Sequence, residues 1–289
     1  MNAETVNLTS LICDSINSIF FRIFSSIDNT VYSNLDNILF INTDIINNLK
    51  FEQLFGTDST NGILLIANSL ILGIVLFYVL KFATAHLIYY SIDSPYQFAF
   101  KCIIFIACMN SSLWICEQII NLNSLISSSI CEIGNSITGQ NITFSNLISN
   151  INSEIYLPVE TFDIFSVSGI IKLVSCIGVI WILITYSIRF IMCKILILLS
   201  PFAFVSLITN HLDGFFKGWL KQFLINLSLQ ILVSLILCVG FSLEFSSNNV
   251  LSQIIYLAII LSIAKCNYNL KELFNYIYEY SNNTLKKFI

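Results

Sequence analysis

Residues 62–264 contain at least five long apolar blocks, and the charged residues between these blocks separate by sign. Lys and Arg gather in one set of connecting segments, while Asp and Glu gather in the other. An α-helix needs about 20 apolar residues to cross a bilayer. The pattern therefore predicts an all-α polytopic membrane protein whose orientation can be read from its charges.

The amino-acid composition also indicates that much of this chain lies in a lipid bilayer. Only 10% of the 289 residues are charged, and 56% are hydrophobic. Soluble domains carry about 25% charged residues, and a soluble fold of this size would bury so much apolar surface only with difficulty. The chain has a net charge of -4 and no arginine-rich patch, so nothing in its composition indicates direct nucleic-acid binding.

We expect three regions along the chain. Residues 1–61 form an extracytoplasmic region with an amphipathic helix over 11–28, where apolar residues recur at helical spacing; this helix fits a membrane surface or a partner equally well. Residues 62–264 form the transmembrane domain, in which an outer loop over 121–168 has no Lys or Arg. Residues 265–289 form a cytoplasmic amphipathic tail. The expected spans are 62–80, 98–120, 169–188, 222–243 and 250–264.

One further apolar piece, 195–208, decides the number of spans. It has 14 residues, a length typical of a re-entrant or interfacial segment, and Pro201 favours a kink within it. Without it there are five spans, and ten of the 13 basic residues lie on the side of the C-terminus. Lys and Arg in short loops favour the cytoplasm. We therefore expect a cytoplasmic (inner) membrane protein with the N-terminus outside and the C-terminus in the cytoplasm.

The sequence gives little support to an enzyme. His86 and His211 are far apart, and a metal site would need more ligands than His211 and Asp213 supply. The chain contains no nucleotide-binding glycine loop, GxSxG or HExxH motif. We therefore expect no catalytic residues, metal or cofactor. The nine cysteines include no CxxC pair, and the sequence leaves open whether Cys13 and Cys131, both expected outside, are oxidised.

The expected spans also bear on transport. Their cores are almost free of ionisable residues, which ion-coupled carriers often use. Uncharged amides do occur, and they suit either helix–helix hydrogen bonds or an aqueous path; they are Asn68, Asn110, Asn226, Gln230 and Gln253. A small-solute permease and a non-conduit membrane assembly factor both remain alternatives.

The most distinctive stretch is 189–230. A basic apolar segment with Ser-Pro is followed by an aromatic, Trp-bearing loop and then by a span with buried amides. Aromatic residues beside lysines are also ordinary anchors at the membrane interface. The candidate structural or gating residues here are Arg189, Lys194, Ser200, Pro201, Phe216, Trp219, Gln222, Asn226 and Gln230.

The order of these features resembles the TrbL/VirB-type polytopic inner-membrane subunits of type IV secretion (conjugation) systems. The matching positions are Arg189, Lys194, Ser200, Pro201, Phe202, Phe216, Trp219 and Gln222. The resemblance implies a channel or scaffold subunit that helps to move DNA or protein across the cytoplasmic membrane. It also implies a homo-oligomer that works with other subunits of the apparatus and its ATPases, and that meets nucleic acid only as a passing substrate.

Overall fold

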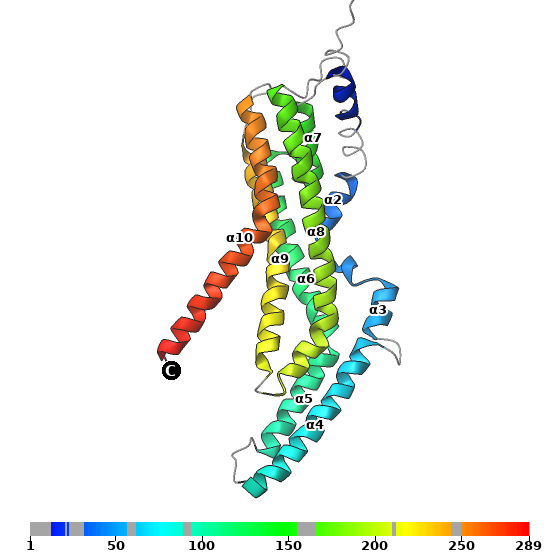
Figure 1. Cartoon of the computed structure of the whole chain (residues 1–289), viewed down its shortest axis with the longest axis vertical. Coiled ribbons are helices and arrows are strands. Elements are labelled where there is room, and N and C mark those ends of the chain that lie inside the picture. Colours follow the sequence, from blue (N-terminus) through cyan, green and yellow to red (C-terminus); the bar gives the residue numbers. More distant parts are fainter. Residues whose placement is uncertain are drawn as a thin grey trace, which may run out of the picture. The chain divides into compact units, whose positions relative to one another are not determined.

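Every regular element that the structure describes is a helix (Figure 1). The computed structural model describes residues 13–20, 22, 32–56, 62–88, 94–154, 166–209, 212–243 and 250–288. Four of its helices are long and apolar enough to cross a membrane, and one bent helix pair makes a fifth if it is counted as a single span. The prediction of an all-helical, polytopic membrane protein is confirmed.

The labelled elements, in chain order, are α2 (Tyr32–Leu39), the 3-10 helix η1 (Thr43–Ile45), α3 (Leu49–Phe55), α4 (Ile63–Ile88), α5 (Pro95–Asn110), α6 (Ser112–Thr138), α7 (Phe144–Glu154), α8 (Val167–Ser206), α9 (Asp213–Ser242) and α10 (Val250–Phe288). The chain divides into two compact units. Unit A comprises Met1–Phe40, Leu125–Ile188 and Leu229–Ile289, and unit B comprises Ile41–Ser124 and Arg189–Ser228. Helices α6, α8 and α9 contribute residues to both.

In unit A, a carboxylate joins α2 to the start of α7. Asp36 accepts hydrogen bonds from the backbone N–H of Phe144 at 2.9 Å, from that of Ser145 at 3.3 Å, and from the Ser145 hydroxyl at 2.5 Å. The first amides of a helix have no partner within the helix, and a negative charge near them is favourable. Leu35, Leu39 and Leu147 are buried alongside, so polar capping and apolar packing hold the same contact.

Replacing Asp36 with alanine is expected to destabilise this contact by about 1–2 kcal/mol, because the cap of α7 is lost. The measurement is limited proteolysis of the purified protein in detergent, with cleavage sites around α7 identified by mass spectrometry. Asn37→Ala is the control, since Asn37 is exposed on the same helix. Equal cleavage rates for the two variants would contradict the role given to Asp36.

The stretch expected as the outer loop 121–168 is largely helical. Helix α6 continues to Thr138, and α7 covers Phe144–Glu154. The serine content suggested a loop, but the Ser128 and Ser136 hydroxyls donate to backbone carbonyl oxygens three residues earlier in the same helix, at 3.0 and 2.7 Å. Serine satisfied in this way is compatible with a helix. Residues 155–165 lie outside the described residues.

The expected span 98–120 is two helices. Helix α5 ends at Asn110 and α6 begins at Ser112, with a bend of 60° between them. The Asn110 side chain donates to the Ile106 carbonyl oxygen at 2.9 Å. Such local side-chain bonds let Asn compete with the helical backbone, which accounts for a break in an otherwise apolar sequence.

Two boundaries expected from the sequence fall inside continuous helices. Helix α8 contains both the expected span 169–188 and most of the segment 195–208, and α10 contains both the last expected span and its tail. At 1.5 Å per residue, the 40 residues of α8 make a helix of about 60 Å, roughly twice the hydrocarbon thickness of a bilayer. The segment 195–208 was expected to be re-entrant or interfacial. A re-entrant segment must reverse its direction, whereas α8 continues unbroken as far as Ser206.

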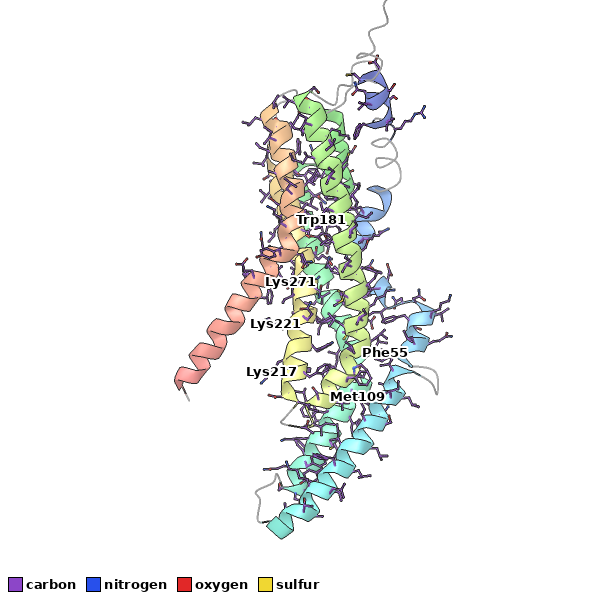
Figure 2. The ribbon with its side chains drawn as sticks, in the orientation of Figure 1. Phe55, Met109, Trp181, Lys217, Lys221 and Lys271 are labelled. Carbon is purple, nitrogen blue, oxygen red and sulfur yellow. The ribbon has the colours of Figure 1, made fainter. Side chains whose placement is uncertain are left out.

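Part of the N-terminal region lies in the core of unit B. Ile41, Ile45, Ile46 and Phe51 belong to the same buried cluster as residues of α4, α5, α6, α8 and α9. Phe55 and Met109, marked in Figure 2, are both fully buried. Asn48 caps the start of α3, and Gly56 ends it in the left-handed conformation. Residues 41–56 are therefore packed helical structure. Of the amphipathic helix expected over 11–28, the structure describes 13–20 and 22, which are helical; its other residues lie outside the described residues.

Candidate functional site

Two side-chain hydrogen bonds join α8 to α9, and each helix donates one of them. Within unit B, residues 189–206 of α8 and 213–228 of α9 form what we call the hairpin (Figure 1). The Arg189 Nε donates to the Asn226 carbonyl oxygen at 2.6 Å. The Trp219 Nε1 donates to the Leu196 carbonyl oxygen at 2.7 Å. Each helix thus supplies one donor and one acceptor, two turns apart, and this reciprocal pattern fixes the register of the antiparallel pair.

Arg189 is the most unusual residue of the hairpin, because its side chain is only 2% exposed. A buried guanidinium is costly unless its N–H groups are hydrogen-bonded. Its acceptor residue, Asn226, donates through its own side chain to the Gln222 carbonyl oxygen at 2.8 Å. The Arg189 side chain on α8 is thus hydrogen-bonded to Asn226 on α9, which is itself hydrogen-bonded to Gln222. Ionisable residues inside membrane helices generally mark functional positions.

Ser200 and Pro201 lie inside α8 without ending it. Proline has no N–H, so it cannot donate to the carbonyl four residues earlier, that of Ile197. The Ser200 hydroxyl donates to that same carbonyl oxygen at 2.7 Å. Ser200 therefore satisfies the acceptor that Pro201 leaves without its helical bond, which lets the helix continue to Ser206. This point of α8 is held by a side chain in place of a backbone bond.

An aromatic cluster packs around Trp219. Its ring stacks on Phe223 with centroids 5.5 Å apart, and it meets Phe216 and Phe204 at 5.7 and 5.9 Å. Phe204 comes from α8 just beyond Pro201, so the cluster connects both arms of the hairpin. Aromatic pairs at these separations add to the stabilisation from burial alone.

Lys194 connects the hairpin to α3. Its Nζ lies 5.6 Å from the ring centroid of Phe51 on α3 and 5.1 Å from that of Phe190 on α8. A cation within about 6 Å of an aromatic ring is attracted to its face. The Lys194 ammonium therefore attracts the Phe51 ring and holds α3 against α8.

Replacing Lys194 with methionine keeps an unbranched side chain but removes the charge, and it is expected to destabilise the protein by about 0.5–2 kcal/mol. Lys217→Met is the control, because Lys217 is exposed and pairs at the surface with Asp213 at 2.8 Å. Such exposed pairs contribute roughly 0–1 kcal/mol. Thermal unfolding in detergent, followed by ellipticity, compares the two; a larger loss for Lys217→Met would contradict the role of the aromatic contacts.

The remaining candidates are more dispersed. Gln222 lies on the hairpin, whereas Gln230 belongs to unit A, where it is buried and its carbonyl oxygen accepts the Ser234 hydroxyl at 3.1 Å. Lys217 and Lys221 lie one turn apart on α9 (Figure 2). His86 is in α4, and His211 lies outside the described residues.

No group of three or more His, Cys, Asp or Glu side chains that could hold a metal ion occurs in the described parts of the chain. Cys13 and Cys131, whose oxidation the sequence left open, are both free thiols.

Four aromatic members of the site were not among the predicted residues. Phe190 lies four residues before Lys194 on α8, so helical spacing alone places the two side chains on one face. Phe223 follows Trp219 by four residues, so helical spacing alone indicates that the two side chains share a face. Phe204 lies in the apolar run after Pro201, where nothing local distinguishes it. Phe51 comes from a segment that the sequence placed outside the membrane, and only the tertiary fold brings it to Lys194.

What the hairpin can do has to be inferred from its own contacts. The chain matches no model of a known protein family, and no curated protein matches it. What the arrangement can do is mechanical: it holds two helices in a fixed register through buried polar contacts. Pro201 lies between these hydrogen bonds and the contact of Phe204 with Trp219, and at Pro201 a bend of α8 breaks no backbone hydrogen bond donated by that residue.

Proposed function

We propose that this chain is a membrane-embedded channel or scaffold subunit of a type IV secretion or conjugative transfer machine, helping DNA or protein to cross the cytoplasmic membrane. The single observation that carries the proposal is the hairpin. Arg189, Trp219 and Asn226, which the sequence singled out, make the two reciprocal bonds between α8 and α9. The resemblance to TrbL/VirB-type subunits rests on this same segment.

The proposed role needs no catalytic residue in this chain. Partner ATPases supply the energy, and a membrane subunit responds by changing the relative position of its helices. The hairpin suits such a response because its register is fixed on one side of Pro201 by buried bonds. A force on the tip of the hairpin would then be carried through α8 as a bend at Pro201 that moves Phe204 against Phe216 and Trp219, without separating α8 from α9 at Arg189.

The proposed orientation places the tip of the hairpin and the C-terminus in the cytoplasm. It rests on the ten basic residues that five spans bring to one side, since positive charge in short loops favours the cytoplasm. Lys217 and Lys221 are near this tip, where partner subunits would be within reach. Because Ile41, Ile45 and Phe51 are buried in the core that contains the hairpin, we restrict the proposed outer part of the N-terminal region to residues before Ile41.

A transfer assay in cells that lack the chromosomal or plasmid copy of the gene tests this role. Complementation with Pro201→Ala or Trp219→Ala is expected to leave the protein in the membrane but to lower transfer well below wild type. Trp181→Ala is the matched control, since Trp181 is 61% exposed on α8 and is expected to transfer normally. Wild-type transfer and assembly in both hairpin variants would contradict the proposal.

A further inference from the structure

Helices α6 and α9 make a serine contact in unit A that sets their register. The Ser127 and Ser234 hydroxyls are hydrogen-bonded to each other, and both residues are buried. Further along both chains, the thiol of Cys238 donates to the Ile130 carbonyl oxygen at 3.3 Å. Residue numbers rise together along the two helices from one contact to the next, so α6 and α9 run parallel here.

The next turn of this parallel pair carries a cysteine on each helix. Cys131 follows Ser127 by four residues, and Cys238 follows Ser234 by four, so both helices advance by about one turn. The carbonyl oxygen that accepts from the Cys238 thiol belongs to Ile130, the residue directly before Cys131. Cys131 and Cys238 therefore occupy one layer of the α6–α9 interface.

A glycine brings the two helices close together at this layer. A Cβ atom placed on Gly134 would lie 2.7 Å from the Cys238 Sγ and 2.4 Å from the Ile142 Cδ1, so any side chain at this position would force the Cys238 and Ile142 side chains to shift. Disulfides need Cα atoms about 4.4–6.8 Å apart, which only closely packed helices provide. Both cysteines are partly exposed, so neither thiol is fully enclosed by protein.

We propose that Cys131 and Cys238 are a redox-active thiol pair whose disulfide locks α6 to α9. The oxidant is a disulfide-bearing molecule that reacts by thiol–disulfide exchange. One cysteine thiolate attacks the oxidant, forms a mixed disulfide and releases the first oxidant thiol. The second cysteine thiolate attacks the mixed disulfide, forms the Cys131–Cys238 bond and releases the second thiol. Two electrons pass to the oxidant, and its two sulfurs leave as thiols with the two protons.

The contacts that place the two cysteines together lie within unit A and are independent of the proposed secretion role. The proposed orientation adds one consequence: this end of α6 and α9 lies on the outer side, where disulfides persist. Oxidation would then remove relative motion between the two helices on that side, and reduction would restore it.

The test uses the full-length protein in membrane vesicles treated with diamide. Free thiols are blocked with N-ethylmaleimide, and the digested protein is searched by mass spectrometry for linked peptides. We expect a peptide that joins Cys131 to Cys238, the loss of two of the nine thiols, and recovery of both after dithiothreitol. The variants Cys131→Ser and Cys238→Ser should each abolish the linked peptide.

A second pair tests the register independently. In a background of Cys131→Ser and Cys238→Ser, the double substitution Ser127→Cys and Ser234→Cys places thiols one turn away, where the hydroxyls are in contact. If this engineered pair forms a disulfide and the native pair does not, the proposal is overturned. If neither forms one, the register between α6 and α9 is wrong and the proposal fails with it. A native disulfide that joins Cys131 to Cys13 instead would also overturn it.

Discussion

Trp219→Ala is expected to lower the free energy of unfolding by about 3–5 kcal/mol, the range for removing a large buried aromatic side chain. Trp219 is 5% exposed and packs on three phenylalanine rings. The substitution also removes the donor to the Leu196 carbonyl. The loss can be measured from thermal unfolding in detergent and from the alkylation rates of Cys116 and Cys193, which are fully buried in unit B.

Two further variants separate the parts of this effect. Trp219→Phe keeps an aromatic ring but not the indole N–H, so we expect a smaller loss, of about 1–3 kcal/mol from the bond and the reduced volume. Trp181→Ala removes an exposed ring of the same type and should change stability by no more than about 0.5 kcal/mol. Equal losses for Trp219→Ala and Trp181→Ala would show that the aromatic cluster does not hold the hairpin.

Gly62→Ala is expected to destabilise unit B by about 1–3 kcal/mol or more, because the added methyl group has no space. A Cβ atom at this position would lie 2.5 Å from the Gly56 Cα, 2.8 Å from the Gly56 N and 2.9 Å from the Phe55 carbonyl oxygen. All three are backbone atoms, so no side chain can move aside. Gly56 itself has a φ of 95° and ends α3, which limits how its backbone can adjust.

Gly73→Ala provides a control of opposite sign. A Cβ atom at Gly73 would meet nothing within 4 Å, and alanine is the better helix former by about 1 kcal/mol. Thermal unfolding in detergent should therefore show a lower midpoint for Gly62→Ala and an equal or higher midpoint for Gly73→Ala. An unchanged midpoint for Gly62→Ala would mean that the corner between α3 and α4 is not packed as described.

The membrane helices could be predicted from sequence because each apolar block is long and contains few charges. Where helices continue or break is set by hydrogen bonds that composition does not show. Pro201 suggested a separate segment, yet the Ser200 hydroxyl satisfies the freed carbonyl of Ile197 and α8 continues. Serines in α6 suggested a loop, but those at 128 and 136 bond within the helix.

The candidate site was predicted as a stretch of sequence and not as a set of contacts. Arg189 and Trp219 were singled out by the order of features in the stretch 189–230, in which a basic, Ser-Pro-containing apolar segment precedes an aromatic loop. Their acceptors are main-chain carbonyl oxygens of Asn226 and Leu196, and every residue has such an oxygen, so no local signal identifies them. Phe51 could not be predicted because its position beside Lys194 depends on the packing of α3 in unit B.

The measurement that tests the proposed role most directly is crosslinking in living cells, followed by affinity purification of the tagged full-length chain and mass spectrometry. The proposal predicts recovery of secretion-type ATPases together with other subunits of a transfer channel. Trp181→Ala should recover the same partners, whereas Trp219→Ala should recover fewer of them at equal membrane abundance. Recovery of this chain alone, as a small oligomer in all three samples, would contradict the proposed function and favour a small-solute permease.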